Sequence, residues 1–134
     1  MDFSKLDIHS TAQNTFRFEV LHPVTGDSTG AFIDVYGAES DPVRKYTASQ
    51  LRQLQKQEFE NSRTRKPKYV ELSELEDRKL ENALVRIAGW ENVKWGKEEM
   101  AFTPENARKL LTACPWLSDQ IVEHSDELGN FLKA

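Results

Sequence analysis

The stretch GWENVKWGKEEMAFTPENARKLLTACPWL, residues 89–117, decides the fold because it holds all three tryptophans and two clear helix starts. Thr103 precedes Pro104; a threonine oxygen can accept from a free N–H of the first helical turn, and a proline there loses no hydrogen bond. Pro115 predicts a second start on the same grounds. Residues 90–96 are expected to form a short loop that ends at Gly96. Large aromatic side chains mostly anchor cores, so the anchors expected to lock the C-terminal helices together are Trp90, Phe102 and Trp116.

A helix is predicted immediately upstream, with an apolar face that runs from Leu72 to Ile87. Its apolar side chains fall on one face, and its acidic side chains gather near the start, where the helix dipole favours negative charge. Ser73 is the candidate cap, and Gly89 is the expected C-terminal stop. The apolar face consists of Leu72, Leu75, Leu80, Ala83, Leu84 and Ile87.

Further upstream lies a basic segment in an acidic chain. Residues 44–68 hold eight basic and two acidic residues, a net charge of +6, whereas the rest of the chain holds ten basic and twenty acidic residues, a net charge of −10. Asp41 followed by Pro42 predicts a helix that continues to residue 62, with Asp41 as its cap. The apolar stripe of this helix is thin, so the helix is expected to project or to cover the core lightly. Pro67 and the repelling like charges then predict a flexible basic connector over residues 63–69.

The N-terminal part of the chain predicts a β-hairpin. Phe16, Phe18 and Val20 alternate with polar residues, which is the period of a half-buried strand. Residues 31–36 are rich in β-branched and aromatic residues, and turn formers fill the loop between the two strands. Residues 1–15 show no period and are expected to be frayed or loosely docked. The predicted fold class is therefore α+β and mainly α, an N-terminal β-hairpin followed by about four helices in a single domain of residues 1–134.

The sequence carries no signature of catalysis, metal binding or nucleotide binding. The only cysteine, Cys114, has no histidine near it in sequence, and the glycines form neither GxGxxG nor GxxxxGK[ST]. The three histidines lack metal-ligand spacing, so they are expected to be solvated or turn residues: His9, His22 and His124. We therefore expect neither an enzyme nor a cofactor. A lone thiol and the absence of a run of ~20 apolar residues favour a cytoplasmic protein without a membrane span.

Four segments are distinctive in their order and spacing: LHPVTGDSTGAFIDVYGAESD (21–41), GWENV (89–93), FTPENARKLL (102–111) and PWLSDQI (115–121). Together they resemble the small tail assembly chaperones of long-tailed bacteriophages and their prophages. The resemblance implies a non-enzymatic protein of the bacterial cytoplasm that binds the tape measure protein during tail assembly and keeps that long helical chain soluble. It also implies a longer, frameshifted form, and Phe131-Leu132-Lys133 can be encoded by a slippery sequence such as UUU UUA AAA. A homo-oligomer is left open.

A protein that holds such a client needs exposed apolar surface with charged rims. The thin stripe on the helix of residues 41–62 is the candidate surface, and its basic neighbours favour acidic client segments. The predicted partner-binding residues are Val43, Tyr46, Leu51, Leu54, Arg63, Arg65, Lys66 and Lys68. Two alternatives stay open: a structural tail or head-completion protein, and a small nucleic-acid-binding regulator that uses the basic segment 44–68. The acidic remainder of the chain makes nucleic acid the less favoured partner.

Overall fold

The computed structural model describes residues 2–11 and 14–132, which form a small mixed fold with one long helix standing away from it. Strands β1 (Thr15–Leu21) and β2 (Ser28–Tyr36) pair antiparallel, with Phe16 opposite Val35 and Phe18 opposite Ile33. The predicted hairpin is thus confirmed. Phe18, Val20, Ile33 and Val35 are buried because alternate residues of both strands point to the same face.

A third strand, β3 (Ile87–Glu91), corrects the sequence-based prediction for this region. It pairs antiparallel with β2, giving the strand order β1-β2-β3. The sequence pattern predicts a helix stop at Gly89 and a loop at Trp90, and both predictions are wrong because the two residues lie in β3. The strand forms because the second edge of β2 offers backbone partners to this segment, and a buried backbone needs such partners. Arg17 of β1 then joins the strands, since its guanidinium pairs with Asp34 of β2 and Glu91 of β3.

The chain after β3 makes a second, two-stranded sheet from β4 (Lys94–Trp95) and β5 (Glu98–Glu99). The turn between them contains Gly96 at φ 69°, a left-handed conformation that a residue without a Cβ adopts at low cost. Trp95 therefore belongs to a small hairpin and is 43% exposed, so the predicted loop was wrong here too.

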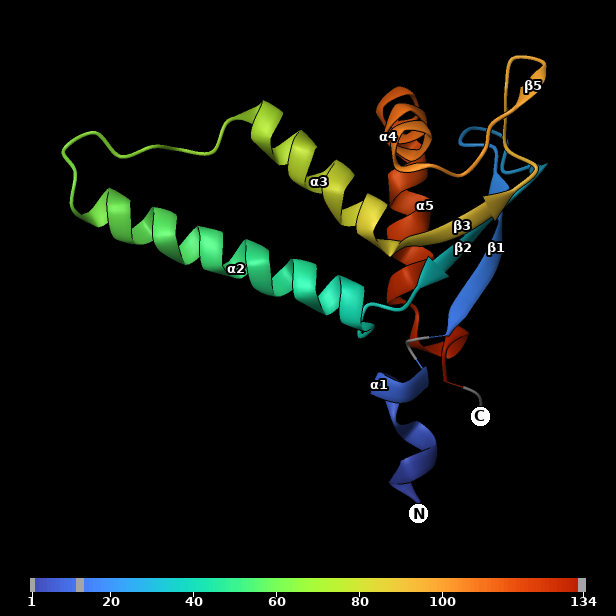
Figure 1. Cartoon of the computed structure of the whole chain (residues 1–134), viewed down its shortest axis with the longest axis horizontal. Coiled ribbons are helices and arrows are strands. Elements are labelled where there is room, and N and C mark those ends of the chain that lie inside the picture. Colours follow the sequence, from blue (N-terminus) through green and yellow to red (C-terminus); the bar gives the residue numbers. More distant parts are fainter. Residues whose placement is uncertain (1, 12–13, 133–134) are drawn as a thin grey trace.

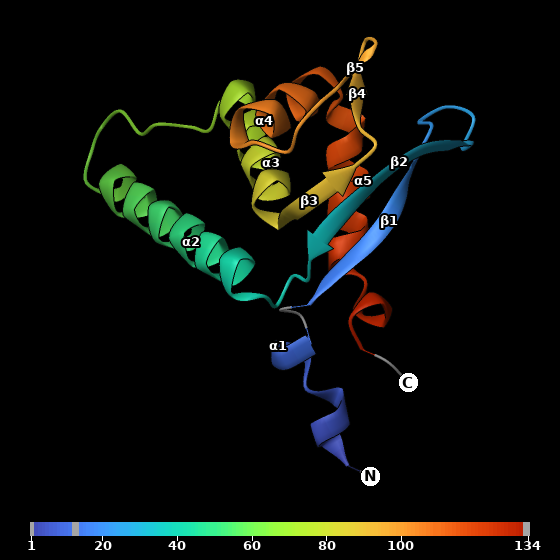
Figure 2. The same ribbon diagram turned by 45° about the vertical axis from the view of Figure 1, so that its right-hand side comes forward.

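Three helices pack behind or beside the three-stranded sheet: α3 (Leu72–Arg86), α4 (Pro104–Ala113) and α5 (Pro115–Asp126). Both views show α5 running along the sheet (Figure 1, Figure 2). The predicted start of α4 is confirmed, since the Thr103 side chain accepts from the Asn106 N–H at 3.1 Å. For α3 the cap position is Glu71, not Ser73, and the helix ends at Arg86.

The core lies between the sheet and these helices. Its fully buried members include Ile33 and Val35 of β2, Leu111 of α4 and Ile121 of α5. The side chain of Gln120 on α5 also bonds to the last residue of β1: its Nε2 donates to the Leu21 carbonyl at 2.8 Å, and its Oε1 accepts from the Leu21 N–H at 3.1 Å. β1 is an edge strand, and the Gln120 side chain satisfies the backbone N–H and carbonyl of Leu21 that a neighbouring strand would otherwise bond.

The long helix α2 (Asp41–Ser62) begins where the Asp41-Pro42 signal predicts. Its N-cap residue is Ser40 rather than Asp41, and the Ser40 side chain makes no capping hydrogen bond. Short 3-10 and α-helical turns occupy the ends of the chain: η1 (Phe3–Leu6), α1 (Ile8–Thr11) and η2 (Leu128–Asn130). The mixed α+β class is confirmed, and the predicted order of a hairpin followed by helices holds except for β3, β4 and β5.

Candidate functional site

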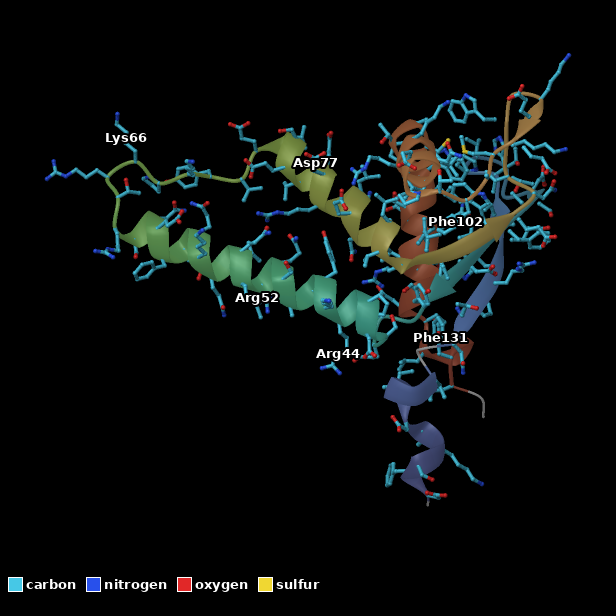
Figure 3. All side chains as sticks on the ribbon, in the orientation of Figure 1. Arg44, Arg52, Lys66, Asp77, Phe102 and Phe131 are labelled. Atoms are coloured by element: carbon cyan, nitrogen blue, oxygen red, sulfur yellow. The ribbon has the colours of Figure 1, made fainter. Side chains whose placement is uncertain are left out.

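The most prominent surface feature is an arm formed by α2, the connector of residues 63–71 and the first turns of α3. Figure 1 shows α2 and α3 diverging as they leave the body, with the connector joining their far ends. Lys66 of the connector points away from the rest of the protein, and Arg52 lies on α2 well outside the body (Figure 3). The arm is therefore the part of the molecule most accessible to a large partner.

The root of the arm is fixed to the body by buried residues. Val43 is 1% exposed and Ser40 is fully buried, so the first turn of α2 belongs to the packed interior. Tyr46 is half-buried, and its hydroxyl donates to the Arg78 carbonyl of α3 at 3.3 Å. Burial raises the pKa of Tyr46, with a smaller contribution from the negative charge of Glu81. Val43 must consequently be removed from the predicted partner surface, because a side chain in the interior cannot contact a partner.

Beyond the root, α2 and α3 enclose a shallow groove of about 430 Å³. Leu54 contributes the main apolar side chain, which is 42% exposed. The other side chains that line it are mostly polar or charged: Tyr46, Thr47, Gln50, Arg78, Lys79 and Asn82. The two helices of the arm are thus loosely packed against each other, because little apolar area is buried between them.

The connector is held to the end of α2 by Asn61. Its Oδ1 accepts from the Lys68 N–H, and its Nδ2 donates to the Lys68 carbonyl, both at 2.9 Å. Arg63 lies over the ring of Phe59, 5.3 Å from its centroid. The predicted basic residues of this segment are all exposed on the connector: Arg63, Arg65, Lys66 and Lys68.

Large apolar side chains are concentrated on the arm as well. Seven of the fourteen exposed large hydrophobic residues among the described residues lie between positions 51 and 75. They include the predicted Leu51 and Leu54, and five that sequence reasoning did not select: Phe59, Tyr69, Val70, Leu72 and Leu75. The extended backbone after Pro67 exposes Tyr69 to 81%, and the divergence of α3 from α2 leaves Leu72 at 71%. Exposed apolar side chains clustered among charges are typical of protein-binding surfaces.

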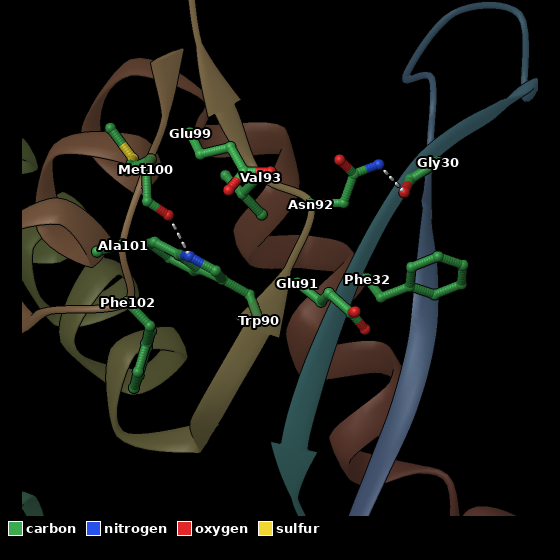
Figure 4. Close-up of a pocket in the computed structure, with 10 residues that line it drawn as sticks. All are labelled: Gly30, Phe32, Trp90, Glu91, Asn92, Val93, Glu99, Met100, Ala101 and Phe102. Carbon is green, nitrogen blue, oxygen red and sulfur yellow. Dashed lines mark hydrogen bonds between the residues drawn. The ribbon is translucent and has the colours of Figure 1, made fainter.

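The predicted anchors have different roles. Trp90 is half-buried, its indole N–H donates to the Met100 carbonyl at 2.8 Å, and its ring meets Phe102 edge-on at 5.0 Å (Figure 4). Phe102 is 41% exposed and lies at the wall of an open pocket of about 590 Å³ beside β3. Trp116 is partly buried and packs against the core. Trp90 thus joins the segment before α4 to the sheet, while Phe102 covers the Trp90 ring from the outside.

Residue types with chemical reactivity do not converge in the described part of the chain. Among the side chains that the structure describes, no three of His, Cys, Asp or Glu are grouped so that they could hold a metal ion. Cys114 is half-buried between α4 and α5, and the His124 ring stacks on Phe18 at 4.2 Å. No helix within the described residues is long and apolar enough to cross a bilayer.

A model of the YdaY prophage protein family matches residues 38–134 of the chain. The matched region begins just before α2 and includes the whole arm, the third strand and the C-terminal helices. Neither a curated protein nor a solved structure matches the chain. Because the family model covers well over half of the sequence, this chain belongs to the YdaY prophage protein family.

Proposed function

We propose that this prophage protein is a non-enzymatic tail assembly chaperone that binds the tape measure protein through its arm and keeps it soluble during tail assembly. Two lines support the proposal: membership of a prophage family, and the resemblance of the four segments quoted above to tail assembly chaperones. The observation that carries it is the concentration of exposed apolar side chains on a charged arm that stands away from the body.

The arm suits a holdase for physical reasons. A long helical client exposes apolar stripes before it assembles, and an accessible helix with apolar residues can cover such a stripe. Leu51 and Phe59 supply this contact along about two turns of α2, being 55% and 61% exposed, whereas Leu54 lines the groove against α3. Charged residues around them keep the free protein in solution, since a larger bare apolar patch would promote self-association.

The proposal is tested by producing the tape measure protein of the same prophage with and without this chain and measuring its soluble fraction. The wild-type chain should raise that fraction and co-purify with the client. Replacing Leu51 and Phe59 by serine should abolish both effects while leaving the circular dichroism spectrum unchanged. The matched control replaces Val24 and Leu128, which are 87% and 56% exposed on other elements, and should behave as the wild type.

A chain that leaves the tape measure insoluble would refute the proposal. The alternative of a structural tail or head-completion protein is distinguished by the composition of purified particles, since a chaperone is absent from them and a structural component is present in stoichiometric amounts. The exposed basic residues of α2 and the connector favour the other alternative, a nucleic-acid-binding regulator, and a steep loss of DNA binding with salt would be its signature.

A further inference from the structure

The helix α2 has two faces with different roles. An inner row faces α3: Val43 is buried, Gln50 and Leu54 line the groove, and Asn61 bonds to the connector. A second row of residues is offset from the inner row by two positions in the sequence. Two positions correspond to a rotation of ~200° around a helix, so this second row lies on the opposite face of α2. This outer row consists of Lys45, Arg52, Lys56 and Phe59 of α2 and is continued by Arg63, the C-cap residue of the helix.

The outer row is exposed along its whole length, and its cations are not neutralised by the protein itself. All five side chains are exposed, Phe59 to 61%. Within the ranges that the structure describes, none of the four cations forms an ion pair, whereas cations on the sheet and between the helices of the body do. The first and last members of the row are eighteen positions apart, or ~27 Å along the helix, so four positive charges and one aromatic ring form a straight stripe directed at solvent.

We propose that the outer row of α2 is the docking face for the client, and that the segment it binds is an amphipathic helix with a stripe of carboxylates. This inference rests on the proposed function and adds the chemistry of the bound segment. Lys45, Arg52 and Lys56 are seven and four residues apart, so carboxylates at the same intervals on a client helix can lie opposite them. An apolar residue of the client next to these carboxylates then covers Phe59. Charge complementarity of this kind raises the association rate and selects the partner.

Two features favour an acidic helix over nucleic acid. Phe59 lies within the outer row, and Leu51 lies beside it. The apolar side of an amphipathic helix can contact both side chains, whereas a phosphate backbone offers no apolar contact. The residues outside 44–68 carry a net charge of −10, and they would repel a polyanion that extends past the arm. A helix of about five turns has the length of the row and ends before the body.

The experiment measures binding of fluorescently labelled synthetic peptides to the full chain by anisotropy. One peptide is an amphipathic helix of about three heptads with leucine on one face and glutamate flanking it. A second carries lysine in place of every glutamate, and a third has the acidic composition with the leucines scattered around the helix. We expect the acidic amphipathic peptide to bind at least about tenfold more tightly than either of the other two, and to lose affinity as salt rises.

The variant Arg52→Glu with Lys56→Glu should weaken that binding by about tenfold or more, because it turns two attractions into repulsions. The neutral variant Arg52→Gln with Lys56→Gln should give a smaller loss in the same direction. Lys94→Glu with Lys97→Glu makes the same change of charge on the β4–β5 hairpin and should leave binding unchanged. All substituted side chains are exposed, so thermal unfolding should stay at the wild-type temperature.

Equal binding of the acidic and basic peptides, or full binding by the Arg52→Glu, Lys56→Glu variant, would overturn the inference. So would tighter binding of a DNA duplex than of the acidic peptide, which would favour nucleic acid, or an effect of the variant on self-association alone, which would make a second copy the occupant. The proposed function is judged separately, by the soluble fraction of the tape measure protein. If the charge-reversed variant still solubilises the client, the function stands and only this docking face is rejected.

Discussion

The side-chain amide of Asn61 bonds to both backbone groups of Lys68, accepting from its N–H and donating to its carbonyl, each at 2.9 Å. These two bonds close the loop that carries Arg63, Arg65 and Lys66, and Gln57 steadies the amide by donating to Asn61 Oδ1 at 2.9 Å. A connector with so many like charges would otherwise have little to hold it, because its side chains are exposed and repel one another.

Replacing Asn61 by alanine should therefore free the connector while leaving the body folded. We expect faster amide hydrogen exchange and faster tryptic cleavage over residues 63–68, with the global free energy of unfolding lowered by less than about 1 kcal/mol. Gln50, another polar side chain of the inner row, provides the control: Gln50→Ala should leave both rates unchanged. Unaltered exchange in Asn61→Ala would mean that the connector is ordered by something other than this pair of bonds.

Arg86 should be the most sensitive charged residue of the body. Its side chain is 10% exposed at the end of α3, and Nη1 donates to Ser125 Oγ at 3.1 Å and to Asp126 Oδ1 at 2.6 Å. Ser125 in turn donates to the Tyr36 carbonyl at 2.6 Å, so Arg86 joins α3 and α5 to the end of β2.

Replacing Arg86 by methionine should lower the free energy of unfolding by about 2 kcal/mol, as measured by urea denaturation, since it leaves the buried Ser125 hydroxyl oxygen without its donor. Asp126→Asn should cost less than about 1 kcal/mol, because the Asp126 side chain is 53% exposed and water can replace the lost charge. Equal losses in the two variants would contradict the view that burial of Arg86, rather than the ion pair, sets the cost.

Trp90 should contribute stability through its indole N–H. The variant Trp90→Phe keeps an aromatic ring against Phe102 but removes the donor to the Met100 carbonyl, so the free energy of unfolding should fall by about 1–2 kcal/mol. Trp95→Phe is the matched control, because Trp95 is 43% exposed and contacts Lys109 at the surface. It should change stability by less than about 0.5 kcal/mol. A larger loss from Trp95→Phe would place the structural anchor in the β4–β5 hairpin instead.

The raised pKa of Tyr46 predicts a specific response to alkali. Its ordinary value is 10.0, and burial together with the charge of Glu81 raises the pKa in the folded protein. Because the folded state holds this proton more tightly than the unfolded state, the resulting stability is present below pH 10 and is lost as pH rises through the folded-state value. The difference in unfolding free energy between wild type and Tyr46→Phe should accordingly shrink above pH 10. A difference in unfolding free energy that grows with pH in this range would contradict a raised pKa of Tyr46 in the folded protein.

Local signals in the sequence were enough for much of the fold. The alternation of Phe16, Phe18 and Val20 predicted β1, and the proline starts at Pro42, Pro104 and Pro115 predicted α2, α4 and α5. These features act within one or two turns of chain, through the fixed φ of proline, the capping oxygen before it and the period of the side chains. The basic segment and its exposed residues Leu51 and Leu54 were also accessible from the pattern, because a thin apolar stripe on a polar helix leaves little to bury.

Contacts between distant segments decided the rest. Residues 87–91 become a strand because β2 presents a free edge, and nothing local distinguishes them from the end of a helix with a glycine stop. Val43 is buried because the root of α2 enters the body, and Arg86 is buried because α5 brings Ser125 and Asp126 to it. The sequence alone shows the spacing of the outer row, because Lys45, Arg52, Lys56, Phe59 and Arg63 follow one another at intervals of seven, four, three and four residues. Only the position of α3 determines that this row is open to solvent along its whole length, while the row of Leu54 borders the groove between the two helices.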